Sequence, residues 1–386
     1  MNRKDTIEAQ LERSGVRRRD FLGFCSRLMV AAPFGLALTS KMTPEAVAAE
    51  VAAAKRPSVI WLHFQDCTGC SETLLRTSQP DLASLIFDVI SLDYHETLMA
   101  ASGHAAEKAL YEAMDANEGN FVCVVEGSIP EKDDGIYMTL AGKPAMQVLK
   151  EVGERAAAVI AMGSCASWGG VPSVGPNPTG AAGVDRFLRT KPLVAIPGCP
   201  PNPYVLLATV LEWARYGTLP EVDSERRPKF AFDRVIHDHC PRRAHFDAGR
   251  FAKSFGDEGH RAGWCLYELG CKGPDTHAAC STRHFNEIEG VWPIGIGAPC
   301  VGCTERHIAF QVPAFDTIPI HRASPPDTYP PVKAPQGMVT PLATGLVGIG
   351  VGAVAGGAFV ASKGFSNTPD DQEVHHPLED EDEEES

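Results

Sequence analysis

Cysteines are the residues of this 386-residue chain best suited to chemistry, and ten of its twelve fall into three spacing patterns. The first set is Cys67, Cys70, Cys165 and Cys199. Four thiolates suit a 4Fe-4S cube or a zinc ion. Glycines beside these cysteines leave backbone N–H groups free to approach sulfur, which favours the cluster.

The second set combines one histidine with three cysteines: His237, Cys240, Cys265 and Cys271. A lone histidine is more often structural than ligating, but these three cysteines lack a fourth partner, which favours His237. His239 is the competing choice. A neutral imidazole in place of an anionic thiolate should raise the potential of a cluster.

The third set has only three members, Cys280, Cys300 and Cys303, and three thiolates suit a 3Fe-4S cluster. Cys123 lies in the apolar run 121–125 and is predicted to be a small buried apolar residue. Two alternatives stay open for the ten ligand cysteines, namely zinc binding and five disulfide bridges. A chain of this length can bury a core without disulfides, which argues against the second.

Short apolar runs alternate with helical patterns in the first half of the chain. Strands are predicted at 57–64, 89–92, 121–125, 158–162 and 193–196, and helices at 105–114, 145–155 and 204–216. This alternation indicates an α/β fold with a parallel sheet covered on both faces. Cys67, Cys165 and Cys199 each follow a strand, so we expect them to meet at the carboxyl edge of the sheet.

The segment after residue 218 has few long periodic runs and many Gly, Pro, His and Cys residues. We therefore expect two domains, 57–218 with the first ligand set and 219–331 with the other two. The second domain should fold around metal rather than around a large apolar core.

Both ends carry targeting patterns. Arg17 to Arg19, followed by Phe21-Leu22 and an apolar stretch, resembles a twin-arginine signal, although Gly23 replaces the usual lysine. We expect a signal peptide at 1–48, which contains Cys25, and export of a folded, metal-loaded protein. A chance arginine triplet is the alternative.

Residues 334–362 carry no charge and are long enough as a helix to span a bilayer. The sequence predicts a transmembrane anchor at 338–362, with a flexible glycine-rich tail as the alternative. Of the carboxylates behind the net charge of −14, ten lie in 370–386, so residues 363–386 are predicted to be an acidic, solvated tail. The rest of the chain offers no basic footprint, which argues against nucleic-acid binding.

The motifs together resemble the small subunit of a membrane-bound uptake nickel–iron hydrogenase, from the leader to the anchor. They are Cys67-Thr-Gly-Cys70-Ser-Glu72, Val125-Glu-Gly-Ser-Ile-Pro130, Gly163-Ser-Cys-Ala-Ser-Trp-Gly170, Pro197-Gly-Cys-Pro-Pro201, His237-Asp-His-Cys240, Phe246-Asp-Ala-Gly-Arg250, Gly263-Trp-Cys265, Leu269-Gly-Cys-Lys-Gly273 and Pro299-Cys-Val-Gly-Cys303.

The resemblance implies a flavodoxin-like domain followed by a smaller, irregular iron–sulfur domain. It also implies an order of clusters. The proximal 4Fe-4S group is Cys67, Cys70, Cys165 and Cys199; the medial 3Fe-4S group is Cys280, Cys300 and Cys303; the distal 4Fe-4S group is His237, Cys240, Cys265 and Cys271.

In this family hydrogen is split on a nickel–iron site of a separate large subunit, and the small subunit conducts the electrons away one at a time. No catalytic residue is therefore expected in this chain. The implied partners are that large subunit and a membrane electron acceptor, either a cytochrome b or an iron–sulfur or quinone-reducing protein. The implied location is the periplasmic face of the bacterial cytoplasmic membrane.

Four positions refine the resemblance. Gly69 and Gly170 stand where oxygen-tolerant relatives carry two additional cysteines, so we expect an ordinary proximal cluster and an oxygen-sensitive enzyme. Ala298 stands where relatives often have histidine, and Pro293 is expected at the missing fourth corner of the medial cluster.

Asp66 and Glu72 flank the proximal motif and are candidates for proton relay at the subunit interface. The alternative is a pair of carboxylates that favour a helix N-terminus.

Two other functions compete with electron transfer in a hydrogenase. A quinone-reductase cluster subunit shares the flavodoxin-like fold but lacks the His-Cys set and the export leader. A secreted zinc or disulfide scaffold would bind partners without redox chemistry.

Overall fold

The computed structural model describes residues 56–77, 81–284 and 288–321. The predicted signal peptide (1–48), anchor (338–362) and acidic tail (363–386) lie outside the described residues, as does Cys25. The chain divides into two compact units, Met1–Val332 and Lys333–Ser386, and every described residue belongs to the first. Among the described residues no helix is both long and apolar enough to cross a membrane.

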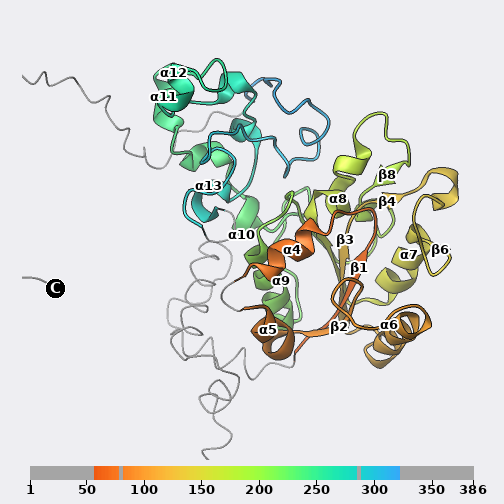
Figure 1. Cartoon of the computed structure of the whole chain (residues 1–386). Helices are drawn as coiled ribbons and strands as arrows, with labels where there is room; N and C mark the ends of the chain where they lie inside the picture. Colours follow the sequence, from red (N-terminus) through yellow and green to blue (C-terminus); the bar gives the residue numbers. More distant parts are fainter. Residues whose placement is uncertain (1–55, 78–80, 285–287, 322–386) are drawn as a thin grey trace, which may run out of the picture. The chain divides into compact units, whose positions relative to one another are not determined.

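A five-stranded parallel sheet organises the first part of the chain (Figure 1). Its strands are β1 (Ser58–His63), β2 (Ser91–His95), β3 (Phe121–Glu126), β7 (Ala158–Met162) and β9 (Leu193–Ile196). They lie in the order β2-β1-β3-β7-β9, which is the flavodoxin-like strand order. The predicted parallel sheet is therefore confirmed, and each predicted strand is found. The second strand starts at Ser91 rather than at residue 89, because a short π-helical turn occupies Leu85–Val89.

Helices cover both faces of this sheet, and the alternation of side chains along each strand divides the core in two. One face packs against α4 (Gly69–Leu75) and α9 (Pro203–Tyr216) through Val59, Trp61, Val124 and Met162. The other packs against α6 (His104–Ala116) and α7 (Ala145–Arg155). The two groups of helices are visible on opposite sides of the strands in Figure 1.

Cys123 lies in β3 on the second face and is fully buried. Burial raises the pKa of its thiol to about 12. The prediction that it acts as a small apolar residue is confirmed.

Two pairs of short strands and two short helices lie outside the five-stranded sheet. A hairpin pairs β5 (Thr139–Leu140) with β6 (Lys143–Pro144), and β4 (Ile129–Pro130) pairs with β8 (Ala181–Ala182). The short helices α5 (Leu82–Ser84) and α8 (Gly163–Trp168) complete this part.

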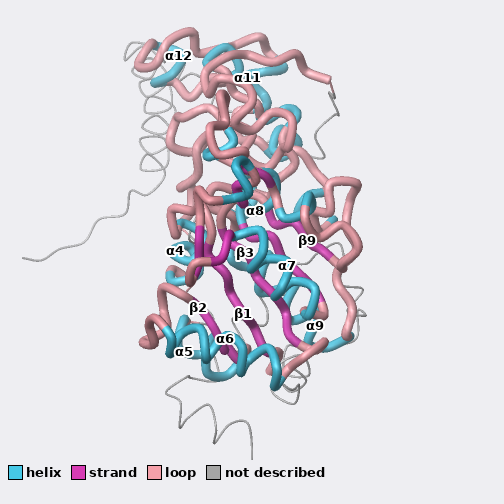
Figure 2. Tube along the Cα trace, turned by 90° about the vertical axis from the view of Figure 1, so that its right-hand side faces the viewer, coloured by secondary structure: helices cyan, strands magenta, loops and turns pink. Residues whose placement is uncertain are grey.

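Residues 219–321 form a part made mostly of loops, as Figure 2 shows. Its helices are single turns: α10 (Lys229–Phe232), α11 (Arg243–Asp247), α12 (Glu258–Arg261) and α13 (Cys280–Arg283). Its apolar cluster is small and includes the predicted ligands Cys240, Cys271 and Cys300. This composition agrees with a segment expected to fold around metal, while its separation from 57–218 as a domain stays a prediction.

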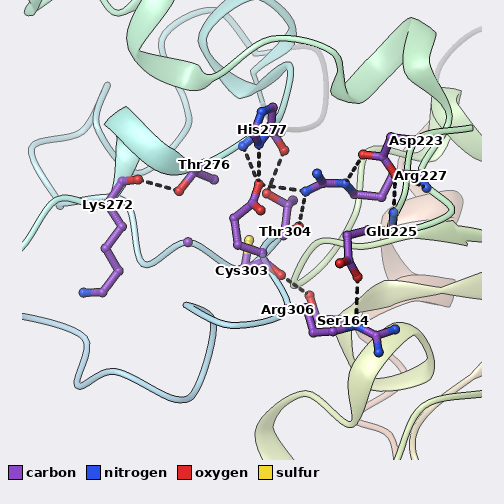
Figure 3. A network of polar contacts seen from close by, with 12 residues as sticks. Ser164, Asp223, Glu225, Arg227, Lys272, Thr276, His277, Cys303, Thr304 and Arg306 are labelled. Atoms are coloured by element: carbon purple, nitrogen blue, oxygen red, sulfur yellow. Dashed lines mark hydrogen bonds and ion pairs between the residues drawn. The ribbon is translucent and has the colours of Figure 1, made fainter. Parts of the chain in front are cut away.

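Polar contacts hold the loop that carries Cys303, and the contact of Ser164 with Cys303 joins this loop to the sheet part (Figure 3). The guanidinium of Arg227, which is 5% exposed, donates to the Thr304 carbonyl at 2.9 Å and to a Glu305 carboxylate oxygen at 2.7 Å. It also pairs with Asp223 at 2.7 Å. The Ser164 hydroxyl, at the start of α8, donates to the Cys303 carbonyl at 2.6 Å. These contacts fix the loop that carries Cys303 against the edge of the sheet.

Candidate iron–sulfur sites

The proximal group forms where three parallel strands end. Cys67 and Cys70 follow β1 in the turn that begins α4, Cys165 lies in α8 directly after β7, and Cys199 follows β9. Because carboxyl ends of parallel strands share one edge, these distant segments converge. The pKa of the Cys70 thiol is raised well above its ordinary value by burial, then by the charges of Glu126 and the other three thiols. All four sulfurs therefore lie within electrostatic reach of one another.

Glycines let the backbone approach these sulfurs. An added Cβ would lie 2.4 Å from the Cys70 Sγ at Gly163, 2.5 Å from the Cys165 Sγ at Gly170, and 3.1 Å from the Cys67 Sγ at Gly69. The first two distances are below any real Cβ contact. The predicted close approach is therefore present, and it is the geometry that a thiolate-bound cluster needs around its sulfurs.

Glu126 at the end of β3 fixes the first ligand loop and had no assigned role in the sequence. Its buried carboxylate accepts from the Cys70 N–H at 2.9 Å, the Ser71 N–H at 3.1 Å and the Ser71 hydroxyl at 2.6 Å. It also accepts from the Trp61 indole at 3.3 Å. The sequence does contain a signal for this role, because Glu126 ends a strand whose other residues are apolar. A carboxylate buried at such a place requires hydrogen-bond donors around it.

The two carboxylates that flank the proximal motif lie in different surroundings. Asp66 contacts the imidazole Nδ1 of buried His63 at 2.6 Å. Burial lowers the pKa of His63, but the hydrogen bond that its imidazole donates to Asp66 and the charge of Glu126 outweigh this effect, so the pKa of His63 is raised overall. Glu72 lies in the first turn of α4, as the helix alternative expects, and its half-exposed carboxylate pairs with Arg76 at 2.6 Å.

The distal group surrounds a small cavity of about 10 Å³ in the loop-rich part. His237, Cys240, Cys265 and Cys271 all line it, together with apolar residues and Arg242. Burial, followed by the charge of Arg243, lowers the pKa of His237 to about 4, so its imidazole is neutral at physiological pH and able to ligate. The competing His239 is not among the lining residues.

His239 has a different partner, because its Nε2 meets the Arg234 guanidinium at 3.0 Å. The cysteines of the distal group are buried, and burial raises the pKa of the Cys240 and Cys265 thiols to about 12. Such thiols would not ionise alone in this cavity, so metal binding would be needed to hold them as thiolates.

The medial group brings together Cys280, at the start of α13, with Cys300 and Cys303. Burial, followed by the charge of a neighbouring thiol of the group, raises the pKa of Cys280 and Cys303 to about 12. Pro293 follows buried Trp292 and precedes buried Ile294, which share the apolar cluster with Cys300. Cys280 packs against the same cluster.

The three groups are connected in the order proximal, medial, distal. A backbone hydrogen bond from Cys199 and the charge of its thiol both act on the pKa of Cys303. On the other side, the charge of Cys271 acts on the pKa of Cys300. The Lys272 N–H, one residue after Cys271, donates to the Cys300 carbonyl at 2.8 Å. The eleven predicted ligands thus form a continuous series.

The structure also bears on the alternative in which the cysteines form disulfide bridges. All eleven cysteines in the described ranges are free rather than disulfide-bonded. Cys67 and Cys199 are exposed, whereas the distal and medial thiols are buried or half-buried. The series therefore begins at the protein surface at its proximal end.

Two family models match the chain. Residues 67–213 match the model described as NADH ubiquinone oxidoreductase, 20 Kd subunit. Residues 232–316 match the model for the C-terminal part of the NiFe/NiFeSe hydrogenase small subunit. The first covers the proximal group and every strand of the five-stranded sheet except β1, and the second covers most of the loop-rich part.

Relatives extend over most of the chain. The Hydrogenase-2 small chain of Escherichia coli strain K12 is 49% identical over 348 residues, which is 90% of this chain and 92% of the relative. The quinone-reactive Ni/Fe-hydrogenase small chain of Wolinella succinogenes is 45% identical over 298 residues, 76% of this chain and 82% of the relative.

A solved structure has the same fold. The Ni-Fe-Se hydrogenase of Desulfomicrobium baculatum in its reduced, active form matches with a TM-score of 0.61 and 36% identity, covering 65% of this chain and 95% of that chain.

Proposed function

The chain belongs to the small subunits of nickel–iron hydrogenases, and from this premise we propose that its eleven ligands hold two 4Fe-4S clusters and one 3Fe-4S cluster. Electrons from hydrogen oxidised on a separate large subunit would leave along them toward a quinone-linked membrane acceptor. The observation that carries the proposal is that the ligand groups adjoin: the Ser164 hydroxyl, beside Cys165, donates to the Cys303 carbonyl, and the Lys272 N–H, beside Cys271, donates to the Cys300 carbonyl.

The residues fit these groups by their chemistry. The proximal set offers four thiols at glycine-lined positions, the distal set three thiols and a neutral imidazole, and the medial set three thiols. Bound there, the clusters would supply one-electron redox chemistry. The protein's own contribution is to hold the ligands: Glu126 orients the Cys70 loop, and Ser164 fixes the Cys303 loop by donating to its carbonyl.

The exposure of Cys67 and Cys199 supports a proximal face that meets the large subunit. A cluster held there would be the first to receive electrons from the partner's nickel–iron site. The name of the Wolinella relative supports a quinone-linked acceptor at the other end, either a cytochrome b or an iron–sulfur or quinone-reducing protein. The leader and the apolar segment 338–362 support an anchored protein on the periplasmic face, exported by the twin-arginine route.

Gly69 and Gly170 support an ordinary proximal cluster and an oxygen-sensitive enzyme. Both contact proximal sulfurs through backbone alone, so neither offers a fifth or sixth thiol. A redox titration should show one oxidation step for the proximal centre. Two successive one-electron oxidations would contradict this part of the proposal.

Matched cysteine variants test the function. Cys303→Ser removes a medial ligand, whereas Cys123→Ser changes a buried cysteine of β3 that lies in no ligand group. The wild-type chain and Cys123→Ser should co-purify with the large subunit, absorb near about 400 nm and contain about eleven iron atoms. Cys303→Ser should lose the 3Fe signal and slow the reduction of a quinone analogue by hydrogen.

The competing functions predict other results. A zinc or disulfide scaffold would be colourless and free of iron and sulfide, and that result would end the proposal. A quinone-reductase subunit would co-purify without a nickel-containing partner.

A further inference from the structure

Lys272 is a fully buried lysine, 0% exposed, in the loop between the distal and medial groups. Its Nζ donates to four backbone carbonyls, those of Gly270 at 3.1 Å, Pro313 at 3.0 Å, Ala314 at 3.0 Å and Asp316 at 3.1 Å. Three of these carbonyls belong to the strap 313–316. A buried lysine normally faces a carboxylate, whereas these four partners are neutral.

The arrangement of acceptors keeps this amine protonated. Four carbonyl oxygens surround Nζ, and a neutral amine would turn its lone pair toward one of them. Burial lowers the pKa of Lys272 overall, although the charges of Cys300, Cys271 and Asp316 act in the opposite direction. The two cysteines belong to different ligand groups, so the cation is balanced by the ligands themselves.

The backbone around Lys272 is held between the same two groups. Its N–H donates to the Cys300 carbonyl at 2.8 Å, and its own carbonyl accepts from the Thr276 hydroxyl at 2.6 Å. Figure 3 shows this contact of Thr276 with Lys272. The Cys300 Sγ lies 3.7 Å from the Thr276 oxygen. The backbone of Lys272 is therefore held against the medial ligand Cys300, directly after the distal ligand Cys271.

We propose that the Lys272 ammonium is a fixed positive charge that raises the reduction potentials of the medial and distal clusters together. The inference rests on the proposed function. One-electron reduction adds one negative charge to a cluster already held by thiolates, and a cation in a low-dielectric interior stabilises that added charge. Lys272 thus acts on the reduction potentials of the clusters through its charge, as a positioning residue, and is not a catalytic residue.

A purely structural role is the competing explanation, because Lys272 also fastens the strap 313–316. The two explanations differ in what they predict. If Lys272 only holds residues 313–316 in place, its loss should affect folding and cluster content. If it acts as a fixed charge, its loss should change reduction potentials in a protein that keeps all its clusters.

The experiment is an EPR-monitored redox titration of the purified complex with its large subunit, with iron content measured on the same samples. Lys272→Met and Lys272→Gln remove the charge, and Lys272→Arg keeps it. Lys253→Met is the matched control, since it removes an exposed charge from the same loop-rich part.

In the neutral variants, the reduction equilibria of the medial and distal clusters should shift at least tenfold toward the oxidised state, which is about 59 mV downward for a one-electron couple. The proximal potential should stay unchanged. Lys272→Arg and Lys253→Met should match the wild type. Unchanged medial and distal potentials in a fully loaded neutral variant overturn the inference, as does an equal shift in Lys272→Arg.

If neither neutral variant retains its clusters, Asp316→Asn decides the question. This exposed carboxylate opposes the lysine charge, and its removal leaves the four carbonyl contacts in place. The medial and distal potentials should then rise, and unchanged potentials overturn the inference. A wild-type complex without iron would instead defeat the proposed function, so the two failures are distinguishable.

Discussion

Gly163→Ala should remove the proximal cluster while leaving the sheet folded. Gly163 opens α8 directly after β7 with φ of +89°, a backbone conformation that side chains with a Cβ rarely adopt. A Cβ at this position would lie 2.4 Å from the Cys70 Sγ. The substitution therefore acts on a ligand of the proximal group from a residue that is not itself a ligand.

The geometry gives the size of the effect. Ordinary contacts of a Cβ start at 3.4 Å, so the sulfur or the backbone must move by about 1 Å. Metal–ligand distances tolerate only about 0.2 Å, so Cys70 cannot keep its bond to iron. The left-handed backbone adds roughly 1–2 kcal/mol of strain.

Gly142→Ala is the matched control. Gly142 has φ of +80°, but no atom lies within 4 Å of its added Cβ. Both variants carry the backbone strain, and only Gly163→Ala meets a sulfur. We expect Gly163→Ala to lose about four iron atoms per chain and the proximal EPR signal. Gly142→Ala should keep both.

The measurement is iron analysis together with EPR of the complex reduced by hydrogen. Full iron content and an unaltered proximal spectrum in Gly163→Ala would refute the reasoning. Equal losses in the two variants would mean that backbone strain, and not the contact with sulfur, causes the effect.

Three further predictions concern other sites. Pro293→Cys should convert the medial 3Fe signal to that of a 4Fe cluster, and an unchanged EPR spectrum would argue against Pro293 at the fourth corner. Arg227→Met leaves the half-buried Glu305 carboxylate with only His277 as its partner, so the free energy of unfolding should fall by about 1.5–3 kcal/mol; thermal unfolding that matches the wild type would contradict this. Burial, followed by the charge of His63, lowers the pKa of His95 to about 3, so stability should be lost as pH falls from 6.5 toward 3. His95→Gln should reduce the loss of unfolding free energy on acidification by up to about 1.4 kcal/mol per pH unit, measured by denaturation at several pH values. The same pH dependence in the variant and the wild type would exclude His95 as the cause.

The sequence predicts three candidate ligand sets because thiolates that share a metal come in sets of matching size and chemistry. The strands were predictable for a related reason. A parallel sheet buried on both faces requires nearly continuous apolar runs, and Phe121–Glu126 and Ala158–Met162 are such runs. Cys67, Cys165 and Cys199 could then be assigned to one edge, since each follows a strand.

The surroundings of those ligands could not be predicted in the same way. Glu126 is one carboxylate among many in the sequence, and only the fold brings the Cys70 and Ser71 N–H groups to it. Lys272 is followed by Gly273 in a polar loop, and nothing in its neighbours along the chain indicates that residues 313–316 return to enclose it. The sequence favours His237 and leaves His239 open, and of these two histidines the cavity lining includes only His237.

The sequence by itself determined which residues can ligate, how many sets they form and that a parallel sheet presents one of them. These properties depend on residue type and on local periodicity. The tertiary structure alone decided how the sets adjoin at Cys199–Cys303 and Cys271–Cys300, and which charges lie beside them. The physical reason is that electrostatic interactions depend on distances between atoms from remote segments, and packing of the whole chain sets those distances.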